Sequence, residues 1–300
     1  MTTAFVLSGG GSLGAVQVGM LQALAAHGIE PDLLVGTSAG ALNAAWVAAH
    51  GTSTDSLAGL ARVWSGLRRS DVFPVDARTA LRGLGGRSAG LFRVDRLQEL
   101  VTTYAGIDDL EEATIPLHLI AADLASGDTV DLHRGPLAPA VLASAAIPGI
   151  FPPVLVGDRH LVDGGVAQDT GVARAVQLGA TTVYVLPTGA ACALPGPPTS
   201  ALGTALHALT LLIQRRLAQD VATCPPTTTI KALPPLCPLR TSPVDFTHGT
   251  ALVDRARRAS EEWIDSGAIE ASRPERFLAN HAHPAGRRPS GRQTPGLRTA

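Results

Sequence analysis

The chain has 300 residues, of which 45% are apolar, and this is enough to fill a hydrophobic core, so a wholly disordered protein is excluded. Its 24 basic and 25 acidic side chains leave a formal net charge of −1, which argues against a nucleic-acid-binding surface. Only 16% of the residues are charged and the mean hydropathy is +0.20, which raises the question of a membrane span.

The two long uncharged stretches, residues 175–214 and 135–157, do not have the pattern of membrane-spanning helices. Both are interrupted by several prolines, and the proline-free part of the first, residues 201–214, is shorter than the ~20 apolar residues that a span requires. No basic residue precedes the apolar run at the N-terminus, so no secretory signal is predicted. We therefore expect a cytoplasmic protein, with peripheral contact as its only association with a membrane.

Cysteine usage predicts neither a disulfide framework nor a metal centre. Cys192, Cys224 and Cys237 are odd in number and lack the spacing of zinc ligands, which fits a reducing compartment. No metal and no organic cofactor are expected, and the sequence does not indicate an oligomeric state.

The predicted elements alternate between strand and helix through most of the chain. A short apolar run at residues 3–8 ends in glycines, which is typical of a buried strand that feeds a tight turn. Because strand, turn and helix repeat in this order, we expect parallel strands joined by crossover helices in an α/β sandwich. The strands are expected at 3–8, 33–35, 117–122, 130–132, 154–162 (a pair) and 182–186, and the helices at 14–27, 39–50, 139–146, 171–178, 201–222 and 250–266.

The sequence indicates one domain over residues 1–275, with its core in residues 4–186. Residues 52–109 carry eight arginines and are interpreted as helices and loops over the core, either a lid or a solvated cover. Residues 200–267 are expected to form a helical C-terminal extension. Residues 276–300 are rich in Pro, Gly, Arg and Ser, so a disordered tail is predicted.

Residues 36–40, Gly-Thr-Ser-Ala-Gly, fit the nucleophile-elbow pattern G-x-S-x-G. A serine on a sharp strand-to-helix turn needs small neighbours so that its hydroxyl can project from the turn. An apolar strand precedes the motif and a helix-forming run follows it, which favours Ser38 as a nucleophile. The alternative is that Ser38 only caps the following helix.

A glycine-rich loop, Gly9-Gly10-Gly11-Ser12-Leu13-Gly14, follows the first predicted strand. It satisfies G-x-G-x-x-G, but a dinucleotide site needs an acidic residue after the second strand, where this chain has the serine motif instead. A phosphate-binding P-loop needs Gly-Lys-Ser/Thr, and the only lysine is Lys231. The remaining role is anion binding by bare backbone N–H groups, which beside a serine nucleophile would be an oxyanion hole.

A serine nucleophile needs a general base, and the sequence offers two kinds. Among the nine histidines, His248 best fits the Ser…Asp…His order of an α/β-hydrolase. Asp163 is the other candidate, in Asp163-Gly164-Gly165 after an apolar strand, although Asp-Gly-Gly alone is more often only a turn.

Together, the three motifs resemble the patatin-like phospholipase family over residues 4–186, with a looser likeness to about residue 267. The stretches 143–153 and 123–127 also look like bacterial members. The resemblance implies a three-layer α/β/α sandwich with a mainly parallel central sheet. It also implies a Ser38–Asp163 dyad, an oxyanion hole at Gly9, Gly10 and Gly11, and supporting residues Ser12, Gly14, Gly36, Gly40, Gly164 and Gly165. Three positions depart from the family pattern. Leu13 stands where many relatives have Arg or Lys, Asp169 where many have Asn, and Gly171 where many have Pro.

We therefore expect a serine acyl hydrolase that cleaves carboxylic esters of lipids through an acyl-enzyme intermediate. Two alternatives are a non-catalytic protein that binds lipid or acyl groups on the same scaffold, and an α/β-hydrolase esterase with a histidine base. The expected partner is a lipid or another acyl ester.

Overall fold

The computed structural model describes residues 1–74, 76, 81, 85, 89–189, 201–237, 239, 241–270, 274 and 278. Apart from Leu278, the predicted tail at 276–300 lies outside the described residues, as do Cys192 and most of residues 75–88 in the predicted lid. The division into domain, lid and tail therefore stays a prediction.

Eight strands of the described chain form one central sheet. Along the sheet, β3, β2, β1, β7 and β8 are parallel, whereas β4 and β6 pair antiparallel with β3, and β5 pairs antiparallel with β6. The mainly parallel α/β sheet that the sequence indicates is thus confirmed. The strands are β1 (Thr3–Leu7), β2 (Leu33–Gly36), β3 (Leu117–Asp123), β4 (Thr129–Leu132), β5 (Val154–Val156), β6 (Arg159–Asp163), β7 (Thr182–Leu186) and β8 (Thr229–Ala232).

The pairing of β3 places β2 and β6 on the same edge of that strand. Leu119 pairs with Gly36 of β2 and with β4, and Ala121 pairs with Asp163 of β6 and again with β4. Because a strand residue has only two edges, β6 continues along the edge where β2 stops. The last residue of β6, Asp163, therefore lies just beyond the carboxyl end of β2, where the chain turns at Ser38.

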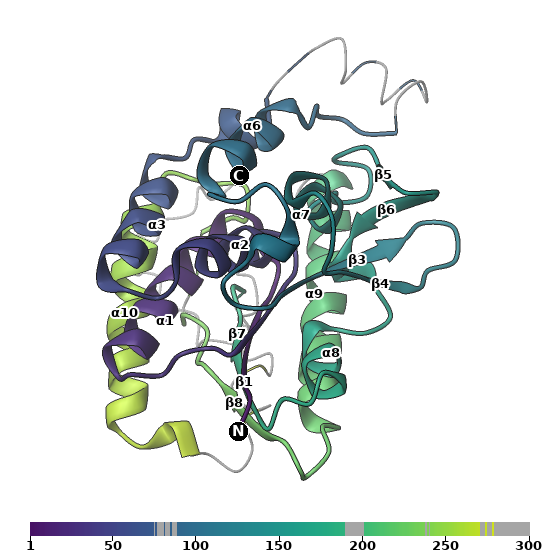
Figure 1. Cartoon of the computed structure of the whole chain (residues 1–300). Helices are drawn as coiled ribbons and strands as arrows, with labels where there is room; N and C mark the ends of the chain where they lie inside the picture. The colour runs from purple at the N-terminus through teal and green to yellow at the C-terminus, as the bar shows by residue number, and fades with distance from the viewer. Residues whose placement is uncertain are drawn as a thin grey trace, which may run out of the picture.

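Helices cover both faces of the sheet, which gives three layers (Figure 1). The helices α1, α2, α3, α6, α7 and α10 lie on one side of the sheet, and α8 and α9 lie on the other. Successive strand residues point to opposite faces, so Phe5 and Leu7 enter the first core while Ala4 and Val6 enter the second. The helices are α1 (Gly14–Ala26), α2 (Ala39–His50), α3 (Thr54–Gly66), α4 (Arg69–Val72), α6 (Asp95–Tyr104), α7 (Leu137–Ser144), α8 (Gly171–Gln177), α9 (Ala201–Ala222) and α10 (Gly249–Asp265), with short 3₁₀ turns η1 (Gly11–Leu13), η2 (Leu110–Glu112), η3 (Gly164–Val166) and η4 (Ala268–Glu270).

Helix α1 is buried almost all round because it lies between the sheet and α10. Its sequence has no charged residue, as expected for a helix without a solvent face. At the crossing with α10, a Cβ on Gly19 would lie 2.2 Å from the Val253 carbonyl oxygen. The C-terminal helices therefore belong to the sandwich: α10 completes one outer layer and α9 the other (Figure 1).

The sequence predictions missed one strand, β8, at the edge of the sheet beside β7. It is short, begins with Thr229 and contains Lys231, so it lacks the apolar run that marks the other buried strands. Within the described residues, no helix is both long and apolar enough to cross a membrane.

Candidate active site

Ser38 occupies a strained turn between β2 and α2. Its φ of 56° and ψ of −121° make it the one non-glycine residue with a positive φ in the described part of the chain. Such a backbone costs about 1–3 kcal/mol and is typical of functional positions. The Ser38 hydroxyl makes no capping hydrogen bond to α2, so the alternative in which this side chain only caps the helix is not supported.

The two glycines of the motif allow this turn to pack tightly. A Cβ on Gly40 would lie 2.1 Å from the Leu7 carbonyl oxygen, and one on Gly36 would lie 2.8 Å from the Ala41 Cα. Both distances are shorter than the 3.0 Å that real Cβ contacts almost never fall below, so larger residues would push α2 away from β1 and β2. The spacing of the motif thus reflects the close packing of α2 on the strand ends.

Ser144, at the end of α7, fixes the backbone of the turn. Its hydroxyl accepts a hydrogen bond from the Ser38 N–H at 3.1 Å and donates one to the Ile120 carbonyl at 2.6 Å. Ser144 is fully buried, so these bonds are shielded from water. The surrounding stretch, 143–153, is part of the family resemblance, but its sequence predicts no role for Ser144.

Asp163 is the buried carboxyl group that faces Ser38. Burial raises the pKa of Asp163 to about 6, although hydrogen bonds from the Ser38 side chain and the Gly165 N–H lower it in part. The Gly165 N–H lies 2.7 Å from Asp163 Oδ1. The structure therefore brings together two residues that are far apart in the sequence, and it leaves the carboxylate with a higher affinity for a proton than a solvent-exposed aspartate has.

Gly164 follows Asp163 in a position that excludes a side chain, and Gly165 lies against the end of the Ile213 side chain. A Cβ on Gly164 would lie 2.1 Å from the Ile120 carbonyl oxygen, and one on Gly165 would lie 2.7 Å from the Ile213 side chain on α9. The Asp-Gly-Gly sequence is thus a turn, as its composition suggests, and that turn also sets the direction of the Asp163 carboxyl group.

The glycine-rich loop lies against Ser38. A Cβ on Gly9 would be 2.9 Å from the Ser38 Cβ and 3.6 Å from its Oγ. Among the described residues, the backbone N–H groups of Gly9, Gly10 and Gly11 have no hydrogen-bond acceptor, and they are thus available to an anion beside the hydroxyl. Thr188 supports the loop because its hydroxyl donates a hydrogen bond to the Gly9 carbonyl.

A second segment holds the loop from its other side. The Ser12 N–H donates to the Pro243 carbonyl at 2.8 Å, and the Ser12 hydroxyl donates to the Ser242 carbonyl at 3.0 Å. Gly14 packs against Trp64, because a Cβ there would lie 2.4 Å from the indole Cη2. Ser12 thus fixes the loop to residues 242 and 243, and Gly14 allows close contact with Trp64, while their role in supporting a catalytic site stays a prediction.

A buried polar network beneath the loop was not predicted. The Gln17 amide donates to the Ser8 and Leu186 carbonyls, each at 2.8 Å, and its oxygen accepts a bond from Asn43 at 2.8 Å. Trp64 Nε1 donates to Asn43 Oδ1 at 2.7 Å. The only signal in the sequence was the presence of Gln17 and Asn43 within mostly apolar helices.

We expect Gln17→Met to lower the free energy of unfolding by about 3 kcal/mol, since each buried polar group left without a partner costs roughly 1–3 kcal/mol. Urea denaturation of both proteins gives this difference. Gln98→Met, at an exposed position on α6, is the matched control and should change stability by less than about 0.5 kcal/mol. Equal effects of the two substitutions would contradict the supporting role of Gln17.

Among the described residues, none of the hydrogen bonds or ion pairs of the histidines involves Ser38. His248 precedes α10 with an exposed side chain, and its Nε2 lies 3.4 Å from Asp245. In the described part of the chain, no hydrogen bond connects His248 with Ser38. The contact with the Ser38 side chain comes from Asp163 instead.

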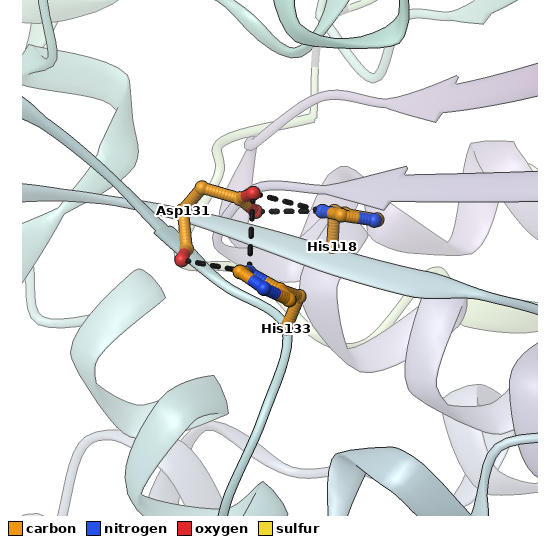
Figure 2. Close-up of side chains that lie close together, drawn as sticks. All are labelled: His118, Asp131 and His133. Atoms are coloured by element: carbon orange, nitrogen blue, oxygen red, sulfur yellow. Dashed lines mark hydrogen bonds and ion pairs between the residues drawn. The ribbon is translucent and has the colours of Figure 1, made fainter. Parts of the chain in front are cut away.

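His118, Asp131 and His133 form a cluster with donor types that suit a metal ion (Figure 2). Asp131 lies 2.9 Å from His118 Nδ1 and 3.3 Å from His133 Nδ1, but it also accepts bonds from Arg174 at 2.8 and 2.6 Å. Burial alone would raise the pKa of Asp131, yet His118 and Arg174 hold it below its usual value. Because the Arg174 guanidinium is already paired with the Asp131 carboxylate, we interpret the cluster as an ion-pair network between β3, β4 and α8.

The three departures from the family pattern have local explanations. Leu13 is buried in the core, Asp169 is exposed and its N–H donates to Thr129 Oγ1 at 3.0 Å, and Gly171 begins α8. A Cβ on Gly171 would lie 2.9 Å from the side chains of both Val6 and Val35, so this glycine allows α8 to approach the sheet.

Comparisons with known proteins relate the chain to a family. A family model described as patatin-like phospholipase matches residues 5–176, which is more than half of the chain. An uncharacterized NTE family protein of Mycobacterium tuberculosis is 33% identical over 160 residues, which cover 53% of this chain and 26% of that protein. Patatin-like phospholipase domain-containing protein 7 of Rattus norvegicus is 30% identical over 196 residues, which cover 62% of this chain and 13% of that protein.

Among solved structures, VipD from Legionella pneumophila aligns with a TM-score of 0.42 at 15% identity, over 88% of this chain and 67% of that one. For the two curated relatives described above, the matched residues of this chain span about a quarter or less of the relative's length. The match of the family model over more than half of its residues shows that the chain belongs to the patatin-like phospholipase family.

Proposed function

We propose that this protein is a serine acyl hydrolase that cleaves carboxylic ester bonds of lipids, with Ser38 as the nucleophile and Asp163 as the proton acceptor. The observation that carries the proposal is the contact between a serine on a strained turn and a buried aspartate whose pKa is raised to about 6. Strained turns and raised carboxyl pKa values are both features of catalytic sites. The family membership adds the expectation of a lipid substrate.

In the first half of the reaction, Ser38 Oγ attacks the carbonyl carbon of the ester while its proton passes to the Asp163 carboxylate. The carbonyl oxygen becomes an oxyanion, which the free N–H groups of Gly9, Gly10 and Gly11 would stabilise. The tetrahedral intermediate then collapses and expels the alcohol, which takes the proton from Asp163. This leaves the acyl group on Ser38.

In the second half, water attacks the acyl-enzyme and gives its proton to Asp163. Collapse of the second tetrahedral intermediate releases the carboxylic acid and returns the proton to Ser38. A carboxylate with an ordinary pKa near 3.9 is a weak base at neutral pH. Burial of Asp163 brings its pKa closer to the working pH, where general-base catalysis is more effective.

The pH dependence follows from this assignment. Only ionised Asp163 accepts a proton, so kcat/KM for a p-nitrophenyl ester should rise about tenfold per pH unit below about 6 and level off above it. Initial rates between pH 4.5 and pH 8, followed at a wavelength insensitive to nitrophenol ionisation, give the profile. His248→Ala should leave the profile unchanged, and loss of the inflection in that variant would favour a histidine base.

The activity itself is tested with p-nitrophenyl butyrate, p-nitrophenyl palmitate and phosphatidylcholine vesicles. We expect release of nitrophenol and of free fatty acid by the wild-type protein, without added metal or cofactor. Binding of fatty acid without hydrolysis of any of these esters would instead support the non-catalytic lipid-binding alternative.

A further inference from the structure

A cleft opens between residues 65–69 and residues 244–247. The first segment links α3 to α4, and the second precedes α10. Its volume of about 540 Å³ lies within the range of ligand pockets, roughly 300–1,000 Å³. Nothing in the proposed mechanism uses this cleft.

Both walls of the cleft are attached to the glycine-rich loop. On one side, the Pro243 carbonyl oxygen accepts a hydrogen bond from the Ser12 N–H. A Cβ on Gly11 would lie 2.3 Å from that oxygen. On the other side, Trp64, which directly precedes the first wall, packs against Gly14. Since Gly9 lies against Ser38 and Gly11 lies against Pro243, the wall that follows Pro243 is connected to the candidate oxyanion hole through the glycine-rich loop.

The charged groups in the cleft favour an anion. Arg68 and Arg69 are exposed on one wall, and within the described residues neither guanidinium group pairs with a carboxylate. Asp245 is the acidic residue on the other wall. Its carboxylate already accepts the Thr247 N–H and hydroxyl at 3.0 and 2.6 Å and lies 3.4 Å from His248. Asp71 accepts the backbone N–H of Arg68 and does not pair with its guanidinium group.

Arginine pairs are well suited to phosphate because their planar donor groups match its oxygens. In a glycerophospholipid, only a few bonds separate the ester carbonyl from the phosphate. We propose that the cleft receives the phosphate headgroup of the substrate, with Arg68 and Arg69 as its cationic contacts, while the ester lies at Ser38. This inference rests on the proposed function and adds the two residues that contact the headgroup of its substrate.

Binding measurements test the inference without relying on turnover. Isothermal titration calorimetry of the full chain carrying Ser38→Ala compares water-soluble dihexanoyl phosphatidylglycerol, dihexanoylglycerol and inorganic phosphate. The test variant adds R68Q and R69Q. The matched control adds R93Q and R96Q, which remove the same charge from arginines that are exposed and paired with Asp95 and Glu99.

We expect R68Q/R69Q to weaken binding of the phospholipid at least tenfold while binding of dihexanoylglycerol changes less than twofold, and R93Q/R96Q to change neither. Equal weakening for both lipids, or none for the phospholipid, would overturn the proposal. Binding of inorganic phosphate with no preference for the phospholipid over dihexanoylglycerol would also overturn it, because the site would then take free phosphate only. Headgroup binding by a wild-type protein that hydrolyses no ester would refute the hydrolase function alone.

Discussion

Asp163→Asn is expected to lower kcat for ester hydrolysis by about 10³–10⁴-fold. The asparagine amide has nearly the same shape as the carboxyl group, and its oxygen can still accept the Gly165 N–H, but it cannot take the proton of Ser38. Steady-state kinetics with p-nitrophenyl butyrate and with phosphatidylcholine give the decrease. A loss of less than about tenfold would show that Asp163 is not the base.

The same substitution should stabilise the fold, and this separates a catalytic loss from misfolding. A carboxyl group whose folded-state pKa is raised binds more protons when folded than when unfolded, so it lowers stability as the pH rises from about 4 to about 6. Above that window the penalty is fully present. We therefore expect Asp163→Asn to raise the free energy of unfolding at pH 8 by on the order of 1–3 kcal/mol.

Asp131→Asn provides a matched control, for which the expected change in the free energy of unfolding has the opposite sign. The pKa of Asp131 is held low by His118 and Arg174, so the charged form stabilises the folded state. Asp131→Asn should therefore lower stability at pH 8 and leave kcat close to the wild-type value. Urea denaturation and kinetics on the two variants compare these effects directly. Destabilisation by both substitutions would contradict the idea that burial of Asp163 is maintained for catalysis at the expense of stability.

Ser38→Ala is expected to lower kcat by at least about 10⁴-fold, because no other group at the site forms the acyl-enzyme. Folding should be nearly unaffected, since the backbone N–H that bonds to Ser144 remains and the hydroxyl does not cap α2. Ser70→Ala, at an exposed position in α4, is the control and should keep full activity. Circular dichroism and ester hydrolysis of the three proteins provide the comparison. Activity retained in Ser38→Ala would place the chemistry elsewhere.

The sequence was informative where a residue type is imposed by local sterics. Gly36 and Gly40 are required by contacts of the turn with its own helix and with β1, so the pattern around Ser38 could be recognised in the sequence. The alternation of strands and helices likewise predicted the mainly parallel sheet. Both features depend on neighbours whose positions follow from chain order.

Other features depend on contacts between distant segments and could not be predicted in this way. The proximity of Asp163 to Ser38 arises because β6 continues the edge of β3 on which β2 ends, and no local pattern encodes that pairing. The bonds from Gln17 to Ser8 and Leu186 are equally non-local. β8 was missed because its strand structure comes from pairing with β7, and its own sequence is not strongly apolar.

The measurement that tests the dyad most directly is the rate and site of labelling by a fluorophosphonate, mapped by mass spectrometry. Activated serines react with such probes at the phosphorus atom and keep the adduct. We expect a single adduct on the peptide that contains Ser38 in the wild-type protein, formed at least about 100-fold more slowly in Asp163→Asn. An adduct on another residue, or equal rates in the two proteins, would contradict the assignment of Ser38 and Asp163.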